Sequence, residues 1–282
     1  AHEVPSADFP PYQVLYPEVM AQKQQVLALA WPRFQKRSGS QEQLQVFLAA
    51  HPWAEAYALF FALKEHFNQQ PWYVWPSELR RFRAAACREA KKQLQSRVEF
   101  HLFVQMVFFK QWQELHAYAQ KKGIRLIGDL PIYVALDSVD VWSNQSIFQL
   151  DAHTSLPTHV AGVPPDYFSK QGQMWGNPLY RWQAADGAVE QQLENWWQQR
   201  LQHNFNMVDV LRIDHFRGFE AYWSVPASEK TAINGQWQPG PGRHFFARMQ
   251  QHLGEQAIIA EDLGIITPEV EQLRSELGYP GM

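Results

Sequence analysis

Three short apolar segments, each ending in a carboxylate and separated from the next by helical sequence, constrain the fold of this chain most. They cover residues 124–129, 208–214 and 257–262 and are rich in β-branched residues, as buried strands are. A helical pattern over 188–205 precedes the second segment, and another over 243–253 precedes the third. Strands that alternate with helices predict right-handed βαβ units and a parallel sheet. We therefore expect an α/β protein.

Each predicted strand brings a carboxylate to its C-terminal end, namely Asp129, Asp214 and Glu261. Side chains alternate along a strand, so Arg212 points the same way as Asp214. An arginine beside an aspartate keeps the carboxylate ionised, which suits a nucleophile but also describes a structural ion pair. Carboxylates that converge at the C-terminal ends of parallel strands are typical of a TIM (β/α)8 barrel. A doubly wound sheet binds ligands at the same edge, but the sequence has no glycine-rich phosphate turn. The expected fold is part of a barrel.

The organisation of the chain changes along its length. Apolar residues at helical spacing dominate the N-terminal part, and we expect a mainly helical insertion subdomain over 1–95. Residues 96–282 are expected to form part of the catalytic barrel. Two long segments without clear periodicity, 135–187 and 216–242, follow the first and second strands and are interpreted as active-site loops.

The composition argues against several classes of partner. The formal net charge is -3 and no basic run occurs, which disfavours a nucleic-acid partner. The single Cys87 rules out a disulfide framework and fits a reducing compartment. Neither a bilayer-spanning apolar run nor a signal-peptide pattern occurs, so we expect a cytoplasmic protein without a membrane partner. His215 and His244 lie near carboxylates but not at metal-ligand spacing, so neither a metal nor another cofactor is expected.

The residue types at the predicted strand ends indicate glycosyl transfer. The chain has 12 tryptophans, several of them in the predicted loops, and flat rings stack well on sugar faces, although core packing is the alternative. A retaining enzyme needs a carboxylate nucleophile and a second carboxyl group as acid/base. Asp214, beside Arg212, fits the nucleophile. Glu261, whose strand neighbours are apolar, fits the acid/base.

Several segments resemble the signature sequences of one family, the bacterial 4-α-glucanotransferases, also called amylomaltases or disproportionating enzymes, of the α-amylase superfamily. The segments are RIDHFRGF at 212–219, IAEDLG at 259–264, GDLPIYV at 128–134, GVPPDYF at 162–168 and GNPLY at 176–180. The resemblance covers nearly the whole chain. It implies a barrel with helical insertions that transfers α-1,4-glucan segments with retention of configuration.

The resemblance also assigns roles to single residues. Asp214 is implied to be the nucleophile, Glu261 the acid/base and Arg212 the partner of the nucleophile. Glucan-binding roles are implied for Asp129, Asp166, Gln173, Trp175, Asn177 and His215. The implied substrates are maltooligosaccharides or starch- and glycogen-type α-glucans.

The sequence departs from the family pattern in one respect. The family uses a third carboxylate, an aspartate after a histidine on a later strand, and no such motif follows Glu261. The opening barrel strands are also missing before Ala1. We therefore expect an internal part of a longer enzyme, inactive as this span alone. The alternatives are a retaining α-glucan hydrolase of the same superfamily and a non-catalytic glucan-binding fragment. The sequence does not indicate an oligomeric state.

Overall fold

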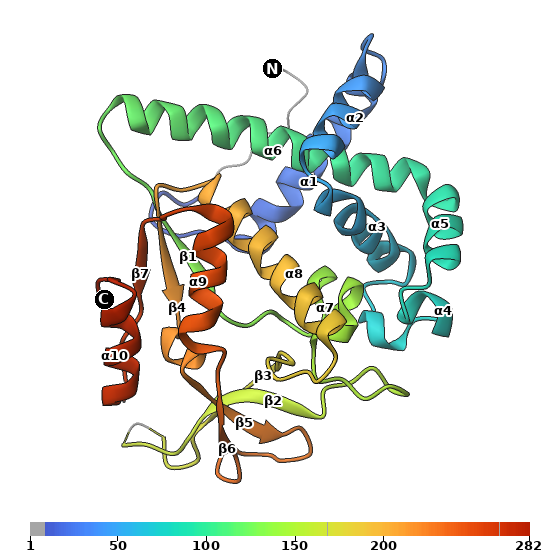
Figure 1. Ribbon diagram of the computed structural model, residues 1–282. Coiled ribbons are helices and arrows are strands. Elements are labelled where there is room, and N and C mark those ends of the chain that lie inside the picture. Colours follow the sequence, from blue (N-terminus) through green and yellow to red (C-terminus); the bar gives the residue numbers. More distant parts are fainter. Residues whose placement is uncertain (1–8, 168, 265) are drawn as a thin grey trace. The chain divides into compact units, whose positions relative to one another are not determined.

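The computed structural model describes residues 9–167, 169–264 and 266–282 (Figure 1). Phe168 of the GVPPDYF segment lies outside the described residues. The chain divides into two compact units. One comprises the described part of Ala1–Gln69 together with Cys87–Gln111, and the other comprises Gln70–Ala86 together with Trp112–Met282. These units do not follow the boundary expected at residue 95, because 70–86 groups with the C-terminal part of the chain.

The first unit is helical, and its helices pack through aromatic side chains. Its elements are α1 (Tyr16–Gln35), α2 (Ser40–Ala50), α3 (Trp53–His66), most of α5 (Ala84–Gln93) and the first part of α6 (Gln95–Lys121). Phe103 of α6 lies with its ring centroid 4.8 Å from that of Phe34 and 5.4 Å from that of Trp31. Large aromatic rings of this kind supply much of the apolar area that a helical core buries.

Within the described part of the chain, no single helix has both the length and the apolar composition of a membrane span. Helices α2 and α3 meet the criterion only as a pair, which is bent by 113°.

The second unit contains the predicted parallel sheet. Strands β1 (Ile127–Pro131), β4 (Val210–Asp214) and β7 (Ile258–Ala260) pair in parallel in the order β1-β4-β7 (Figure 1). Helix α8 (Gly187–Phe205) precedes β4, and α9 (Gly242–Leu253) precedes β7. The predicted α/β class is therefore confirmed. Leu211 and Ile213 of β4 are buried, and the residues that alternate with them point to the opposite face.

A further segment pairs with this sheet beyond α10 (Pro268–Glu276). Gly281 forms a parallel bridge with Ala260 of β7. The Ala260 N–H donates to Pro280 O at 2.9 Å, and the Met282 N–H donates to Ala260 O at 3.1 Å. The sequence does not predict this pairing, because glycine and proline are typical of turns rather than strands.

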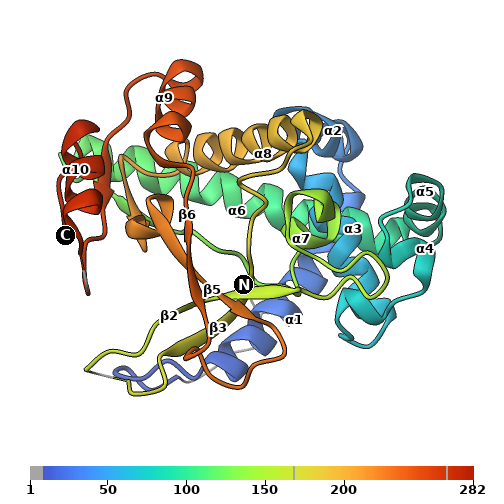
Figure 2. The ribbon, with the colours of Figure 1, turned by 60° about the horizontal axis from the view of Figure 1, so that its bottom comes forward.

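The two segments predicted as irregular loops instead form an antiparallel sheet, so that part of the prediction is wrong. The strands are β2 (His159–Val163), β3 (Gln173–Pro178), β5 (Ala221–Pro226) and β6 (Gln236–Pro239), in the order β3-β2-β5-β6 (Figure 2). The central pairing of β2 with β5 joins two segments that are distant in sequence. Short strands that contain glycine or proline carry little alternation, so the pattern that predicts strands is absent from them.

The remaining short elements place several loop tryptophans in the core. They are η1 (Trp72–Val74), α4 (Ser77–Arg80), α7 (Val139–Ser143), η2 (Gln145–Ile147) and η3 (Phe216–Phe219). Trp72 and Trp142 are fully buried, and their indole N–H groups donate to Leu136 O at 2.6 Å and to Leu79 O at 2.8 Å. By contrast, Trp175 is 38% exposed. Core packing therefore explains Trp72 and Trp142, whereas Trp175 and Trp237, which is 41% exposed, are open to a ligand.

Asp209 ties the end of α6 to the start of β4. Its carboxylate accepts hydrogen bonds from Gln120 Nε2 and from the Leu126 N–H, both at 2.8 Å, and lies 3.0 Å from His116 Nε2. The hydrogen bond from Gln120, followed by that from Leu126, lowers the pKa of Asp209 to about 2.

We expect Asp209→Asn to lower the thermal midpoint of unfolding at pH 7, and the difference from the parent protein to shrink as the pH approaches 2. A carboxylate whose pKa is lower in the folded state stabilises that state above its unfolded pKa, about 3.9. This contribution is lost as the pH falls through the folded pKa, about 2. Thermal unfolding of both proteins between pH 2 and pH 7 measures it. A difference that does not vary with pH would show that the hydrogen bonds do not depend on the charge.

Candidate active site

Arg212 joins two carboxylates on one face of the parallel sheet. Asp129 of β1 lies opposite Arg212 in the strand register, and Asp214 is the last residue of β4. Arg212 Nη1 donates to Asp129 Oδ1 at 2.6 Å and to Asp214 Oδ1 at 3.0 Å. The bond to Asp129 is the largest cause of the raised pKa of Arg212. The side chains of Asp129 and Asp214 are 60% and 43% exposed, so both carboxylates are open to a ligand.

Glu261 follows β7 directly and continues the pairing of β7 with β4. Its N–H donates to Ile213 O at 3.0 Å. Its carboxylate oxygens accept from the His215 N–H at 3.0 Å and from the Leu263 N–H at 2.7 Å. The residues on both sides of Asp214 are therefore hydrogen-bonded to Glu261, and the two carboxylate-bearing residues lie at neighbouring positions of one sheet edge.

The surroundings of Glu261 differ from the apolar ones expected from its strand neighbours. The residue is 8% exposed, but each of its carboxylate oxygens accepts one backbone N–H. A carboxylate oxygen has about two lone-pair sites, so each oxygen retains one for a ligand. Sequence could not reveal these donors, because they come from the turn after β4 and from the turn after Glu261 itself.

His215 forms the turn that follows Asp214. Its backbone is left-handed, with φ 54°, and in this conformation its N–H reaches Glu261. Its ring atom Nε2 is buried and has no hydrogen-bond partner among the described residues. Burial, and to a lesser degree the charge of Arg217, lowers the pKa of His215 to about 4. The ring is therefore neutral at pH 7, and its unpartnered Nε2 atom is closed to solvent.

Strand β3 carries three predicted glucan-binding residues, Gln173, Trp175 and Asn177. Its pairing with β2 is irregular between Met174 and Pro178, so simple alternation does not set which way Trp175 and Asn177 point. The Trp175 ring lies edge-on to His215, with centroids 4.8 Å apart, and its indole N–H donates to Gln173 Oε1 at 3.2 Å. Asn177 Nδ2 donates to Val134 O at 2.9 Å. Trp175 therefore contacts the turn that carries His215, whereas Asn177 is bonded to the segment after β1.

Sequence analysis does not predict a role for Tyr133, which belongs to the same cluster. Its ring centroid lies 6.2 Å from that of Trp175 and 6.3 Å from that of His215. The feature of the sequence that could have pointed to Tyr133 is its position four residues after Asp129 in the GDLPIYV segment. That signal does not separate an aromatic residue of the site from one of the core.

Asp166 is held in a local turn. Its N–H donates to Ser169 O at 3.0 Å, and its Oδ1 accepts from the Ser169 N–H at 2.7 Å. Aspartate is favoured in such turns whether or not a ligand binds. The glucan-binding role predicted for Asp166 therefore stays a hypothesis.

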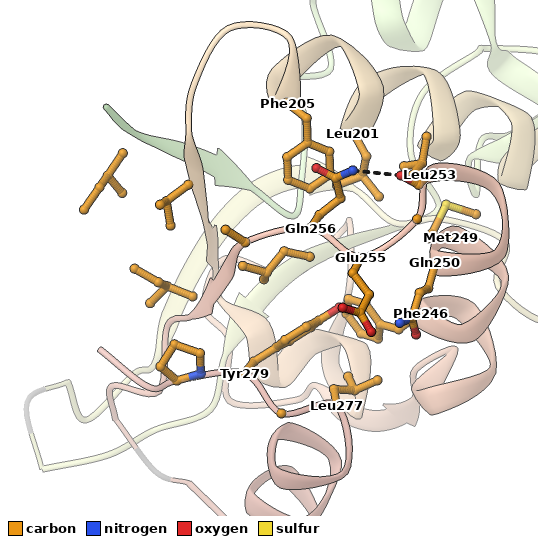
Figure 3. A pocket seen from close by; sticks show the side chains of 18 of the residues that line it. Leu201, Phe205, Phe246, Met249, Gln250, Leu253, Glu255, Gln256, Leu277 and Tyr279 are labelled. Carbon is orange, nitrogen blue, oxygen red and sulfur yellow. Dashed lines mark hydrogen bonds between the residues drawn. The ribbon is translucent and has the colours of Figure 1, made fainter. Parts of the chain in front are cut away.

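A cavity of about 540 Å³ lies at the other end of the parallel strands (Figure 3). It is bordered by the first residues of β1, β4 and β7 and by side chains of α8 and α9. Its lining is largely apolar, with side chains such as Leu201, Phe205, Phe246 and Met249. None of the predicted site residues belongs to its described lining. Polar side chains, among them Gln250, Glu255 and Gln256, also line it, but the predicted catalytic carboxylates lie at the opposite end of the strands.

Metal binding has no candidate in the described ranges, because no group of three or more His, Cys, Asp or Glu residues there is placed to hold an ion. The site offers three carboxylates, Asp129, Asp214 and Glu261, with Arg212 bonded to the first two, beside the aromatic cluster.

Comparison with known proteins gives a consistent result. The chain matches the family described as 4-alpha-glucanotransferase over residues 2–282. It is 48% identical over 278 residues to the 4-alpha-glucanotransferase of Thermus thermophilus and 44% identical over 274 residues to that of Aquifex aeolicus (strain VF5). Each match covers 97% of this chain and 54% of the relative, so the chain spans about half the length of the curated relatives it matches.

A solved structure is also similar. Amylomaltase from Streptococcus agalactiae, determined in complex with acarbose, matches with a TM-score of 0.90 and 39% identity, over 97% of this chain and 55% of that one. The family match extends over nearly all of the sequence, and the solved relative shares the fold. The chain belongs to the 4-alpha-glucanotransferase family.

Proposed function

We propose that the intact protein transfers α-1,4-glucan segments between maltooligosaccharides by a retaining double displacement. The observation that carries the proposal is the neighbouring position of Asp214, bonded to Arg212, and Glu261 at one sheet edge. A retaining mechanism needs two carboxyl groups about 5–5.5 Å apart across the scissile bond. Neighbouring strands lie about 4.7–4.9 Å apart, so side chains at adjacent positions on one face can meet this spacing.

In the first step, an Asp214 oxygen attacks C1 of the sugar while Glu261 gives a proton to the glycosidic oxygen. The C1–O bond breaks, and the reducing-end fragment leaves as an alcohol. In the second step, the 4-hydroxyl of an acceptor glucan attacks C1, the bond to Asp214 breaks, and Glu261 takes the hydroxyl proton. The two inversions leave the new bond in the α configuration.

Arg212 fixes the nucleophile in this scheme. It contacts Asp214 through Oδ1, so we assign the attack to Oδ2. The same guanidinium donates to Asp129. The exposed carboxylate of Asp129 accepts hydrogen bonds from sugar hydroxyls in this scheme. Acarbose in the solved structure of the relative from Streptococcus agalactiae supports an oligosaccharide ligand. We propose further glucan contacts from His215, Trp175, Gln173, Asn177 and Asp166.

We also propose that β1, β4, β7 and the segment 280–282 are successive strands of a (β/α)8 barrel. The parallel order follows the chain order, and α8, α9 and α10 precede successive strands, both of which support this proposal. We propose residues 1–95 as an insertion subdomain, mainly helical, of which 70–86 group with the C-terminal part of the chain. Residues 96–282 are part of the catalytic barrel, with 135–187 and 216–242 as its active-site segments.

Incubation of the intact protein with maltotriose tests the proposed function. A transferase converts two maltotriose molecules into maltopentaose and glucose, then into a ladder of longer and shorter glucans, and leaves the number of reducing ends unchanged. A hydrolase increases the number of reducing ends without longer products. Binding of maltotriose without any conversion would indicate the non-catalytic alternative.

A further inference from the structure

Arg200 of α8 donates to two consecutive carbonyl groups at the end of β1. Its Nη2 donates to Pro131 O at 2.7 Å, and its Nη1 donates to Ile132 O at 3.2 Å. Ile132 O also accepts from the Tyr180 hydroxyl at 2.7 Å. Strand β1 ends at Pro131, which has no N–H with which to continue a ladder. The side chains of Arg200 and Tyr180 therefore donate the hydrogen bonds to these carbonyl groups that a neighbouring strand would otherwise donate.

The other side of the Arg200 guanidinium lies against two tryptophans of its own helix. Its Cζ is 4.9 Å from the centroid of Trp197 and 5.2 Å from that of Trp196. Asp140 is close enough for its charge to interact with that of Arg200, although burial is the larger effect and raises the pKa of Asp140. The two rings stand at 85° to each other, so the guanidinium lies within cation–π distance of both without stacking flat on both, while its N–H groups donate hydrogen bonds to the main chain.

Tyr133, the next residue along the chain, connects these carbonyl groups to the proposed active site. Its ring is nearly parallel to that of Tyr180, with an interplanar angle of 20° and centroids 6.2 Å apart. On another side its centroid lies 6.3 Å from that of His215, whose N–H donates to Glu261. The contacts thus run from Arg200 through the main chain and Tyr133 to the turn that holds the acid/base.

We infer that Arg200 is a positioning residue for glucan transfer, which fixes the main chain at Pro131 and Ile132 and so holds Tyr133 against His215. The kinetic consequence rests on the proposed function. The geometric consequence, the packing of Tyr133 on His215, can be measured without catalysis.

The fork of an arginine is required for this role. Two separate nitrogens reach the two carbonyl groups, whereas a lysine offers one ammonium group without a planar face. A displacement of about 1 Å near reacting groups can cost about 100-fold in rate. For Arg200→Lys in the intact protein we expect kcat for maltotriose conversion to fall about 10- to 100-fold, with KM changed less than about threefold. Tyr180→Phe removes one donor from Ile132 O, together with the long 3.5 Å hydrogen bond that the hydroxyl accepts from Arg200 Nη1. It keeps both bonds from Arg200 to the main chain and should act in the same direction with a smaller effect.

Arg248→Lys is the matched control. Arg248 of α9 forms an ion pair with Glu194 of α8, so this variant also weakens a partly buried arginine contact of the same helix. We expect it to lower the thermal midpoint of unfolding about as much as Arg200→Lys does, with kcat unchanged. Equal losses of kcat in both variants would show a general structural effect and overturn the inference. If Arg200→Lys fails to fold, the comparison is made with Tyr180→Phe.

The second readout is the titration of His215, followed by NMR of protein labelled with ¹⁵N-histidine and assigned with a His215→Asn variant. Burial lowers the pKa of this ring to about 4, with Arg217 as the charged neighbour that adds to the effect. If Tyr133 moves away, water reaches the ring and its pKa rises toward about 6.5. We expect this rise in Arg200→Lys and not in Arg248→Lys.

The two readouts separate the inference from the proposed function. An unchanged His215 titration in Arg200→Lys overturns the inference even if the parent protein converts maltotriose. A raised His215 pKa in a protein whose parent does not convert maltotriose supports the positioning and refutes the proposed function alone.

Discussion

Replacing Asp214 with asparagine in the intact protein is expected to abolish measurable glucan transfer, and replacing Glu261 with glutamine is expected to slow it by about 10²- to 10⁴-fold. The first change removes the proposed nucleophile, without which no covalent intermediate can form. The second removes the proton transfer and one of the two backbone hydrogen bonds, because a glutamine amide has a single acceptor oxygen. The proposed nucleophile and its bond to Arg212 remain. Release of glucose from maltotriose measures both losses.

Asp262→Asn is the control for these two variants. Asp262 is the residue after Glu261 and lies 3.6 Å from Arg274, away from the bonds that join Glu261 to His215. We expect it to keep near-normal turnover. The assignment of roles is wrong if either Asp214→Asn or Glu261→Gln behaves as this control does.

Azide distinguishes the two roles directly. With Asp214→Gly and α-maltotriosyl fluoride, azide can occupy the place of the missing carboxylate, displace fluoride in one inversion and give the β-azide. With Glu261→Ala, Asp214 still displaces fluoride, and azide then attacks the covalent intermediate to give the α-azide. An α-azide from Asp214→Gly, or a β-azide from Glu261→Ala, would show that the two roles are reversed.

The sequence was sufficient to predict the carboxylate edge of the parallel sheet, because its signals are local. Alternation along β4 places Arg212 and Asp214 on one face, and their hydrogen bond agrees with that prediction. Apolar β-branched residues mark β4 and β7, and the helices between them predict parallel pairing. Alternation and composition can be read from a few consecutive residues, and parallel pairing follows from the general preference for right-handed βαβ connections.

The features that sequence did not predict depend on pairing between distant segments. The antiparallel sheet arises from β2 and β5, whose partners cannot be read from either strand alone. The same holds for the bond from the His215 N–H to Glu261, for the packing of Tyr133 and for the bonds from Arg200 to the end of β1. These contacts are not marked in the sequence, because each joins a residue of ordinary type to a segment that is distant along the chain.

Arg212→Met is expected to lower kcat by about 10²- to 10³-fold, since a preorganised charge beside the reacting groups commonly contributes that much. In the parent protein one guanidinium nitrogen donates to both Asp129 and Asp214. Without it, two carboxylates that share one face of the sheet have no cation between them, and like charges disfavour each other's ionised form. We therefore also expect the acid limb of the pH–rate profile to move to higher pH.

A double variant identifies the cause of this loss. Asp129→Asn added to Arg212→Met removes the repulsion, so part of the lost kcat should return and the acid limb should move back toward its position in the parent. If Arg212 acts only by orienting Asp214, the double variant gains nothing over Arg212→Met, because the orienting bond is missing in both. Asp129→Asn alone keeps the bond from Arg212 to Asp214, which makes it the reference for the loss of sugar contacts at Asp129. The cycle of four proteins thus separates charge neutralisation from orientation, since residues that share one partner are not expected to be additive.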